Sequence, residues 1–599
     1  MPLHSKVRAL GLALLLTITA VGLSAWTTAP SSSRTASSDA ATAPAPVPEY
    51  AENGMVVSAK RTASEAGVEM LKKGGNAVDA AVATGFALAV VHPFAGNIGG
   101  GGFMVIRNPD GSVTTIDHRE DAPSGATQDV YLDDEGNAAR TRSRRGYLAS
   151  GVPGTVAGLL KALDEHGRLD RATVMAPAIR LAEEGFPLPH ALAEDLNDRY
   201  RAFAEFPVTK AYFTKGSASS KYRTGERFVQ TDLAQTLKRI RDEGKSEFYE
   251  GETASLIAEQ FQANGGLIDE QDLAEYEAVE REPVTATYRG YEVHSMGPPS
   301  SGGVAIAQLL NAAERKDISQ MGFNSSATAH YLGEAMRRVF ADRAKWLGDP
   351  DHVQVPTEGL IQKDYMQQRM ASFTSSRVTP EDSIRAGEPM LTGESMETSH
   401  YSVADSSGMA VSVTTTLNSG YGSKVVIDGA GFFMNNEMND FVLKPGVPNQ
   451  FGLSGTKRNL VAPDRRMVSS MSPTIVEDPQ DRLHLVIGAP GGSTIITTTF
   501  QVIMNVIDHG MNVEQAVTAG RIHHQWKPRH LSYEEFALST DVVRNLRTRE
   551  WDVTKGVFGG IPQWGRAQGL RIKHPDRPDQ VRVFRGSSDP RGPGAAVGF

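Results

Sequence analysis

The chain has 599 residues, of which 40% are hydrophobic and 22% are charged, a composition typical of a globular protein with a large core. The formal net charge is −9 and no long basic run occurs, so nucleic acid is not an expected partner. The absence of cysteine excludes thiol nucleophiles, disulfides and zinc–thiolate sites.

The N-terminus has the features of an export signal. Residues 1–26 contain a basic start with Lys6 and Arg8, an apolar run of signal-peptide length and small residues near Ala25. An uncleaved membrane anchor is the alternative, although the run is short for a span. Residues 27–50 are rich in Ser, Thr, Ala and Pro and predict a flexible linker. We therefore expect an exported protein, periplasmic or secreted, without a stable membrane anchor.

Two consecutive helices are predicted after the linker. Thr62 and Glu65 form a capping-box pattern at the start of the first helix. Asn76 and Asp79 open the second helix, which ends before Pro93. The second helix is apolar on nearly all faces, and its length favours burial in a large core over a membrane span.

The rest of the chain alternates between helical patterns and strands. Residues 101–120 predict a hairpin around an Asn-Pro-Asp-Gly turn. Residues 379–397 are polar and irregular, and a second hairpin with alternating polar and apolar residues follows Thr398. Further strands are predicted at GAGFFMNN, MSPTIVED and LHLVIGAP. This order predicts a layered α/β core in which one sheet stacks on another.

Familiar catalytic and binding motifs are missing from the sequence. It contains no HExxH, Walker A, GxSxG or GxGxxG pattern. The Gly-rich stretch GNIGGGG precedes a strand and not a helix, so it favours close backbone packing over a phosphate cradle. The adjacent histidines of RIHHQW have no suitably spaced carboxylate, so a metal there is the less favoured interpretation. We expect no metal and no cofactor.

Several polar clusters remain after these exclusions. Taken singly, each fits an ordinary structural role, such as a surface ion pair, a solvated acidic pair or a turn. A Gly-Gly turn after a strand can also point backbone N–H groups at a ligand. The clusters are Arg119 in DHREDAP, Glu437 and Asp440 in NNEMNDF, Ser469 and Ser470 in MVSSMSP, and Gly491 and Gly492 in GAPGGS.

Taken together and in order, long stretches of the sequence resemble the gamma-glutamyltransferase family, also called gamma-glutamyltranspeptidase or glutathione hydrolase, of the N-terminal-nucleophile hydrolase superfamily. The most specific are GGNAVDAAVATGFALAVVHPFAGNIGGGGFM, GPPSSGG, TSHYSVAD, NNEMNDF, KPGVPNQFGL, SSMSPTI and GAPGGS. The resemblance implies a four-layer αββα sandwich built jointly by two autocleaved fragments. These are a large subunit, residues 51–397, and a small catalytic subunit, residues 398–599.

The resemblance also implies roles for individual residues. Thr398 matches the nucleophile at which the precursor cuts itself, after Glu397, and Thr416 matches the threonine that hydrogen-bonds its hydroxyl. The substrate's α-carboxylate would be held by Arg119, Ser469 and Ser470, its α-amino group by Asn418, Glu437 and Asp440, and the oxyanion by Gly491 and Gly492. Phe451 stands in the lid loop where many bacterial relatives have Tyr, which removes one hydroxyl hydrogen bond from the closed lid.

The expected chemistry needs no histidine base. An N-terminal threonine can use its own α-amino group as the base, and a pKa of about 7.7–8.0 suits that role near neutral pH. Because Arg119 precedes the cut and the other site residues follow it, the fragments are expected to stay together as a heterodimer.

We therefore expect a self-processing enzyme that cleaves the gamma-glutamyl bond of glutathione and related donors. It would form a gamma-glutamyl-threonine acyl-enzyme and pass the acyl group to water or to amino acids and peptides. One alternative is a cephalosporin or glutaryl acylase, but the substrates of such enzymes lack the α-amino group, so Glu437 and Asp440 would meet no cation. The other alternative is an inactive exported binding protein.

Overall fold

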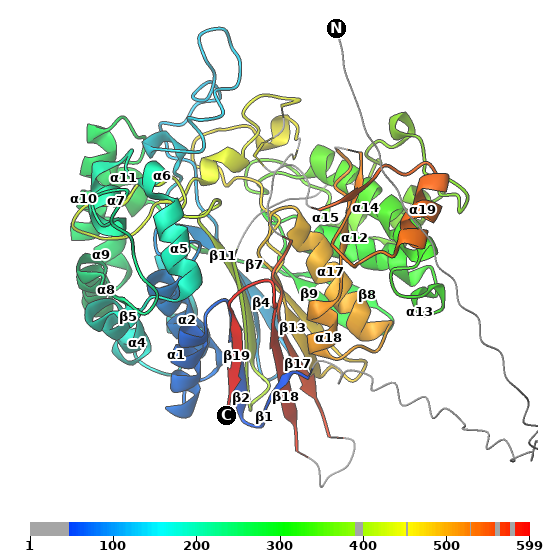
Figure 1. Cartoon of the computed structure of the whole chain (residues 1–599), viewed down its shortest axis with the longest axis horizontal. Coiled ribbons are helices and arrows are strands. Elements are labelled where there is room, and N and C mark those ends of the chain that lie inside the picture. The colour runs from blue at the N-terminus through cyan, green and yellow to red at the C-terminus, as the bar shows by residue number, and fades with distance from the viewer. Residues whose placement is uncertain are drawn as a thin grey trace, which may run out of the picture. The chain divides into compact units, whose positions relative to one another are not determined.

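Two antiparallel sheets form the centre of the protein (Figure 1). The computed structural model describes residues 47–389, 399–447, 449–450, 453, 455–527, 529–556, 564–575 and 581–599. In this part of the chain, the first sheet has the strand order β1 (Glu49–Ala51), β18 (Val583–Ser588), β17 (Gln568–Lys573), β13 (Leu483–Ile487), β12 (Thr474–Glu477), β9 (Tyr291–Ser295) and β8 (Val284–Tyr288). The second sheet has the order β19 (Ala595–Gly598), β2 (Gly54–Ser58), β10 (Ser399–Asp405), β11 (Ala410–Thr416), β3 (Gly101–Arg107), β4 (Val113–His118) and β7 (Val279–Arg281).

Strands from distant parts of the sequence lie side by side in both sheets. The C-terminal strand β19 pairs with β2, and β1 pairs with β18 (Figure 1). Each sheet therefore mixes strands from before residue 389 with strands from after residue 399. Residues 46–599 form one compact unit.

Apolar side chains fill the space between the two sheets. Valine, isoleucine and other residues that suit a covered pleated surface supply this inner core. They include Met55, Val57, Val105, Ala404, Ile475, Val486, Leu570 and Phe584.

Helices cover the outer face of each sheet (Figure 1). On the side of the second sheet lie α1 (Arg61–Lys72), α2 (Ala77–Val91), α3 (Thr155–His166), α4 (Arg171–Glu184), α5 (His190–Asp198), α6 (Tyr200–Phe203), α7 (Pro207–Phe213), α8 (Thr231–Glu243), α9 (Lys245–Glu250), α10 (Glu252–Ala263) and α11 (Glu270–Ala274). On the side of the first sheet lie α12 (Gly302–Glu314), α13 (Ile318–Met321), α14 (Ser326–Trp346), α15 (Thr357–Leu360), α16 (Lys363–Arg369), α17 (Thr494–Ile507), α18 (Val513–Thr518) and α19 (Thr540–Thr548). The order helix, sheet, sheet, helix confirms the predicted four-layer sandwich.

Short strands outside these layers complete the secondary structure. They are β5 (Phe186–Pro187) with β6 (Arg227–Phe228), and β14 (Ile522–His523) with β15 (Leu531–Tyr533) and β16 (Val553–Lys555).

The helix α2 has the buried environment that its apolar sequence predicts. All of its residues are buried, and it packs against α1, α4 and the second sheet. The Asn76 side chain accepts hydrogen bonds from the N–H groups of Val78 at 2.9 Å and Asp79 at 3.1 Å. The Asp79 carboxylate in turn accepts the Asn76 N–H at 2.7 Å. This reciprocal capping box confirms the predicted start of the helix.

Asn76→Ala should lower the free energy of unfolding by about 1 kcal/mol, because the substitution leaves two N–H groups of the first turn without their acceptor. Urea unfolding followed by circular dichroism measures this difference. Asn137→Ala, at an exposed loop position, should change the unfolding free energy by less than about 0.5 kcal/mol. Equal unfolding curves for Asn76→Ala and the wild type would contradict the capping role.

Some local predictions are wrong. Lys60 is the N-cap of α1 and makes no side-chain capping bond, so Thr62 already lies in the first turn and the predicted box with Glu65 does not form. The strand predicted at GAGFFMNN is also absent: residues 429–436 make isolated bridges at Phe433 and Met434 instead.

The hairpin of β10 and β11 forms as predicted, with Ser399 paired to Thr415. Alternation of polar and apolar residues is typical of a half-buried strand, yet every residue of both strands is buried. The reason is that α2 covers one face of the hairpin while the first sheet covers the other.

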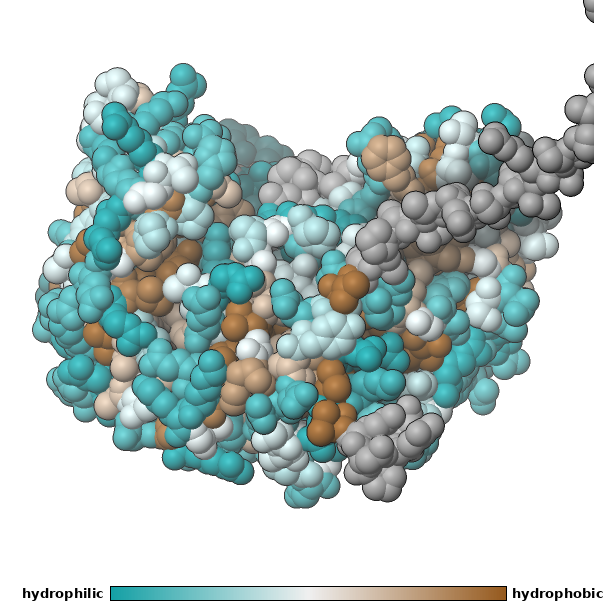
Figure 2. Space-filling view, turned by 60° about the horizontal axis from the view of Figure 1, so that its bottom comes forward, coloured by the Kyte–Doolittle hydropathy of each residue, from teal (hydrophilic) through white to brown (hydrophobic). Residues whose placement is uncertain are grey.

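The outer surface is mixed in polarity. Figure 2 shows a face on which hydrophilic residues predominate and hydrophobic residues occur in small groups, as is ordinary for a folded protein. Among the described residues, no helix combines the length and the hydropathy needed to cross a membrane. The predicted signal peptide and residues 27–46 of the predicted linker lie outside the described residues. The predicted end of the linker at residue 50 is wrong, because Glu49 and Tyr50 belong to β1.

Candidate active site

A buried cluster of charges lies at the end of β4. Arg119 follows this strand directly and is fully buried. Its guanidinium donates hydrogen bonds to Glu437 at 2.6 Å and to Asp440 at 2.9 Å, and Glu120 lies 3.5 Å away. Arg119 is therefore no surface ion pair, which was its ordinary interpretation. Glu120 was not among the predicted site residues, although its position next to Arg119 in DHREDAP was an available signal.

The surrounding backbone fixes the arginine in place. The Arg119 N–H donates to Asp117 at 2.9 Å, and its carbonyl accepts the Tyr276 hydroxyl at 2.8 Å. On the other side, a single 3-10 turn, η3 (Glu437–Asp440), presents both acidic residues to the guanidinium. These contacts bring residues more than 300 positions apart into one cluster.

The cluster contains more acidic than basic groups, because three carboxyl groups surround one guanidinium. Burial raises the pKa of Asp440 to about 6 and that of Glu120 to about 8, while the attraction of Arg119 opposes the rise. Burial also raises the pKa of Glu437 well above its usual range. One oxygen each of Glu120 and Glu437 has no hydrogen-bond partner among the described residues. These buried acceptors could take a cationic donor group.

Asn418 connects the end of β11 to this cluster. Its backbone N–H donates to Thr416 Oγ1 at 2.6 Å, and its side-chain amide donates to the Asn436 carbonyl at 2.9 Å. The same amide lies 3.5 Å from Asp440 Oδ1, and its oxygen accepts from Gln450 at 2.7 Å. Asn418 is held with a positive φ of 68°. This strained conformation persists because the side chain has partners on both sides.

The predicted Gly-rich stretch packs closely against β11. A Cβ atom on Gly100 would lie 1.9 Å from the Thr416 carbonyl, and one on Gly102 would lie 2.4 Å from the Thr414 carbonyl. Asn97 from the same stretch donates to the Thr416 carbonyl at 2.7 Å. Close backbone packing, the favoured interpretation of GNIGGGG, is therefore confirmed, and its effect is to position Thr416.

Ser469 and Ser470 lie beside the segment that precedes α12. The N–H and hydroxyl of Ser301 donate to the Ser469 carbonyl at 3.1 and 3.0 Å. The Ser470 hydroxyl is buried and has no hydrogen-bond partner among the described residues. Two residues earlier, the Met467 to Val468 stretch reaches the charge cluster, where the Met467 carbonyl accepts from Arg119 Nε at 3.3 Å. The serines and Arg119 thus belong to one neighbourhood.

The Gly-Gly turn lies between β13 and α17. Gly491 and Gly492 have φ values of 136° and 64°. At Gly491 a Cβ atom would lie 2.7 Å from the backbone of Gly565. Both the backbone conformation and the space therefore require glycine at this position.

His400 lies inside β10 with both ring nitrogens engaged. Nδ1 lies 3.0 Å from Thr414 Oγ1, and Nε2 lies 3.0 Å from Ser402 Oγ. Burial lowers the pKa of His400 to about 3. The ring is therefore neutral at physiological pH and serves the strand's hydrogen bonding.

Three of the predicted residues, Glu397, Thr398 and Phe451, lie outside the described residues. Thr416 lies in β11 directly after Thr415, which pairs with Ser399 of β10.

A cavity lies beside the segment that is predicted to form the lid. It is lined by Asp440 together with Arg343, Val447, Asn449, Leu453 and neighbouring residues. The segment predicted as a lid thus borders the charge cluster.

Two stacked antiparallel sheets, covered by helices on both outer faces, define the fold class of the N-terminal-nucleophile hydrolases. The family profile described as Gamma-glutamyltranspeptidase matches residues 63–599. The chain belongs to the gamma-glutamyltranspeptidase family.

Individual relatives agree with this membership. The chain is 47% identical, over 84% of its length and 86% of the relative's, to the glutathione hydrolase proenzyme of Escherichia coli (strain K12). The match to a solved structure of cephalosporin acylase from Bacillus halodurans covers 94% of this chain and 99% of the acylase chain, with a TM-score of 0.80 and 28% identity. A gamma-glutamyltranspeptidase chain from Helicobacter pylori covers 57% of this chain, with 97% of its own length matched, a TM-score of 0.56 and 44% identity.

Proposed function

We propose that the chain is a self-processing gamma-glutamyltransferase that uses glutathione and related gamma-glutamyl compounds as donors. The observation that carries this proposal is the buried cluster in which Arg119 meets Glu437, Asp440 and Glu120. A gamma-glutamyl head has an ammonium and a carboxylate on one carbon, so its site needs acceptors and a guanidinium close together. A cluster with several carboxyl groups and free acceptor atoms meets the first need, and Arg119 with Ser470 meets the second.

The proposed reaction runs through an ester on Thr398. The Thr398 hydroxyl attacks the γ-carbonyl of the donor while the α-amino group of Thr398 takes the hydroxyl proton. The N–H groups of Gly491 and Gly492 would stabilise the oxyanion, where loss of one donor costs about 3 kcal/mol in comparable sites. The donor's amine leaves with the proton, and water or an acceptor amine then attacks the ester and frees Thr398.

The same residue would create its own N-terminus in the precursor. Its hydroxyl would attack the Glu397 carbonyl, and hydrolysis of that ester would leave the two fragments. The mixed strand order of both sheets supports a heterodimer, because neither fragment supplies a whole sheet. The N-terminal sequence supports export, to the periplasm or out of the cell, and residues 444–459 are proposed as the lid, with Phe451 at the gate.

The acylase alternative fits the site less well. The cephalosporin acylase shares the fold at 28% identity, whereas the glutathione hydrolase proenzyme shares 47%. A glutaryl donor has no ammonium, so the carboxylates of Glu437 and Asp440 would be buried without a counter-charge from the substrate.

Incubation of the purified enzyme with glutathione, with and without glycylglycine, tests the proposal. Mass spectrometry should find glutamate in the first reaction and gamma-glutamyl-glycylglycine as an additional product in the second. Turnover of glutaryl amides with none of glutathione would favour the acylase, and turnover of neither would favour a binding protein.

The pH dependence of the processed enzyme should show an acid limb that does not depend on His400. Activity requires a neutral α-amino group on Thr398, so kcat/KM should fall as the pH falls below the pKa of that group. Protonation of Asp440, whose pKa burial raises to about 6, removes a partner of the substrate's ammonium in the same direction. We therefore expect a limb steeper than one proton.

His400→Asn is the variant that checks this assignment. The acid limb of kcat/KM should persist in whatever processed His400→Asn enzyme forms, because the imidazole has a pKa of about 3 in the wild type. A limb of only one proton in processed His400→Asn enzyme, in place of the steeper limb of the wild type, would identify the histidine as the base and refute the N-terminal threonine mechanism.

A further inference from the structure

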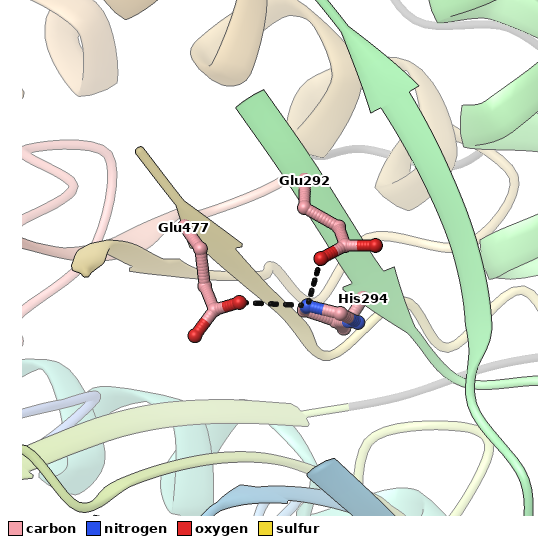
Figure 3. Close-up of side chains that lie close together, drawn as sticks. All are labelled: Glu292, His294 and Glu477. Carbon is pink, nitrogen blue, oxygen red and sulfur yellow. Dashed lines mark hydrogen bonds and ion pairs between the residues drawn. The ribbon is translucent and has the colours of Figure 1, made fainter. Parts of the chain in front are cut away.

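Three side chains with metal-binding atoms meet at the ends of β9 and β12 (Figure 3). Glu292 and His294 are two residues apart on β9 and so point to the same face. Glu477 pairs with Glu292 across the neighbouring strand. Figure 3 shows both carboxylates directed at the His294 ring. This cluster lies at the other end of these strands from Ser300 and Ser469, which adjoin the candidate active site.

The spacing of the atoms is close to that of a metal coordination shell. One nitrogen of His294 and one oxygen of each carboxylate all lie within 4.8 Å of one another. His294 Nε2 is 3.3 Å from Glu477 Oε2 and 3.9 Å from Glu292 Oε2. Zinc bonds of about 2.0–2.2 Å in a tetrahedron require ligand atoms roughly 3.3–3.5 Å apart. Glu292 can close the remaining gap, because its side chain is 43% exposed.

Neighbouring groups orient two of the three ligands. His294 Nδ1 lies 3.0 Å from Thr285 Oγ1. When Nδ1–H donates to this hydroxyl, Nε2 presents its lone pair to the two carboxylates, which is the usual arrangement of a metal-ligating histidine. Arg107 donates to Glu477 Oε1 at 2.5 Å, and this leaves Oε2 directed at the histidine. Arg107 is itself fixed by the Gly408 carbonyl at 3.0 Å.

The charges also suit a divalent cation. With His294 neutral, the carboxylates of Glu292 and Glu477 and the guanidinium of Arg107 leave one net negative charge. A protonated His294 that bridges the two carboxylates is the competing account of the same geometry, and it requires no metal.

We infer that Glu292, His294 and Glu477 bind one divalent cation of the zinc class, with a water completing the tetrahedron. The ion would join β9, which precedes residue 398, to β12, which follows it. Binding itself does not depend on the proposed cleavage, whereas the role of the ion as a link between two fragments rests on it.

Zinc titration of the chelator-treated full chain by isothermal calorimetry tests the inference. The wild type should bind one equivalent of Zn²⁺, and its melting temperature should rise with zinc concentration. Glu292→Gln and His294→Gln should each weaken binding by more than roughly 10–100-fold, which is the cost of losing a residue that only hydrogen-bonds to a metal ligand. His190→Gln, which removes an exposed histidine elsewhere, should bind like the wild type.

Cobalt provides a second readout at the same site. Co²⁺ bound by one imidazole and two carboxylates should give a visible absorption spectrum that Zn²⁺ abolishes. If His294→Gln does not fold, Glu292→Gln still carries the test, because that side chain is partly exposed. A wild type that takes up no Zn²⁺, or binding of equal strength in Glu292→Gln, would overturn the inference and leave the protonated-histidine account.

The link between fragments needs a separate measurement. In processed enzyme, Zn²⁺ should raise the urea concentration at which the two fragments separate on a sizing column, and Glu292→Gln should not respond. Binding of Zn²⁺ to a chain that stays uncut would retain the metal site and reject only the proposed processing. Binding without any effect on separation in cut enzyme would reject the linking role.

Discussion

Thr398→Ala should yield a single uncut chain with no gamma-glutamyl transfer or hydrolysis. The substitution removes the hydroxyl that is proposed to cut the precursor and to form the acyl-enzyme. A denaturing gel should show one band for Thr398→Ala and two bands for the wild type. N-terminal sequencing of the smaller wild-type band should begin at Thr398.

Thr398→Ser is the matched control for this experiment. It keeps a hydroxyl and an α-amino group, so it should process and retain part of the activity. A small fragment that starts elsewhere, or an uncut Thr398→Ala chain that turns over glutathione, would remove Thr398 from the mechanism.

Asp440→Asn should lower kcat/KM for gamma-glutamyl donors by about 30-fold to several thousand-fold. The expected loss is about 2–5 kcal/mol, the cost of removing one partner of a desolvated charge pair. Processing should persist, because the asparagine keeps the size of the side chain that Arg119 and Asn418 contact. Initial rates on a gamma-glutamyl anilide measure the effect, and Asp428→Asn, at an exposed position, should leave kcat/KM unchanged.

A glutaryl anilide separates ammonium recognition from general damage. This donor lacks the α-ammonium, so Asp440→Asn should change its kcat/KM far less than that of the gamma-glutamyl anilide. An equal loss on both donors would contradict ammonium binding by Asp440. Arg119→Ala is a poorer test, because it would leave three buried carboxylates without their cation and is expected to destabilise the protein by about 3–5 kcal/mol.

The sequence predicted the stacked sheets and three members of the charge cluster, Arg119, Glu437 and Asp440, but neither Glu120 nor how these residues meet. Glu437 and Asp440 are three residues apart, and both contact the Arg119 guanidinium from the 3-10 turn η3. Their contact with Arg119 spans 318 and 321 positions, and no local spacing rule reaches that far. The resemblance to the family identified Arg119, Glu437 and Asp440 as candidate site residues, and the structure showed the ion pairs between them.

Other features escaped prediction for specific physical reasons. The alternating pattern of β10 is typical of a half-buried strand, whereas the whole strand is buried. Its polar residues, such as Ser402 and His400, can be buried because they have hydrogen-bond partners inside the protein. The cluster of Glu292, His294 and Glu477 was not expected, because His294 and Glu477 are 183 positions apart and form no motif. Helix α1 starts at Arg61, so Thr62 lies in the first turn and is not the N-cap that the capping pattern requires.

The interleaved strand order has a consequence for how the protein tolerates unfolding. In the precursor, one polypeptide keeps β9 and β12 at a high effective concentration, so the two sheets can reassemble within a single molecule. After the proposed cut, complete unfolding would release two chains, and reassembly would require them to meet by diffusion. At low protein concentration the mature enzyme would then depend on a slow rate of unfolding to persist, while its precursor could rely on repeated refolding.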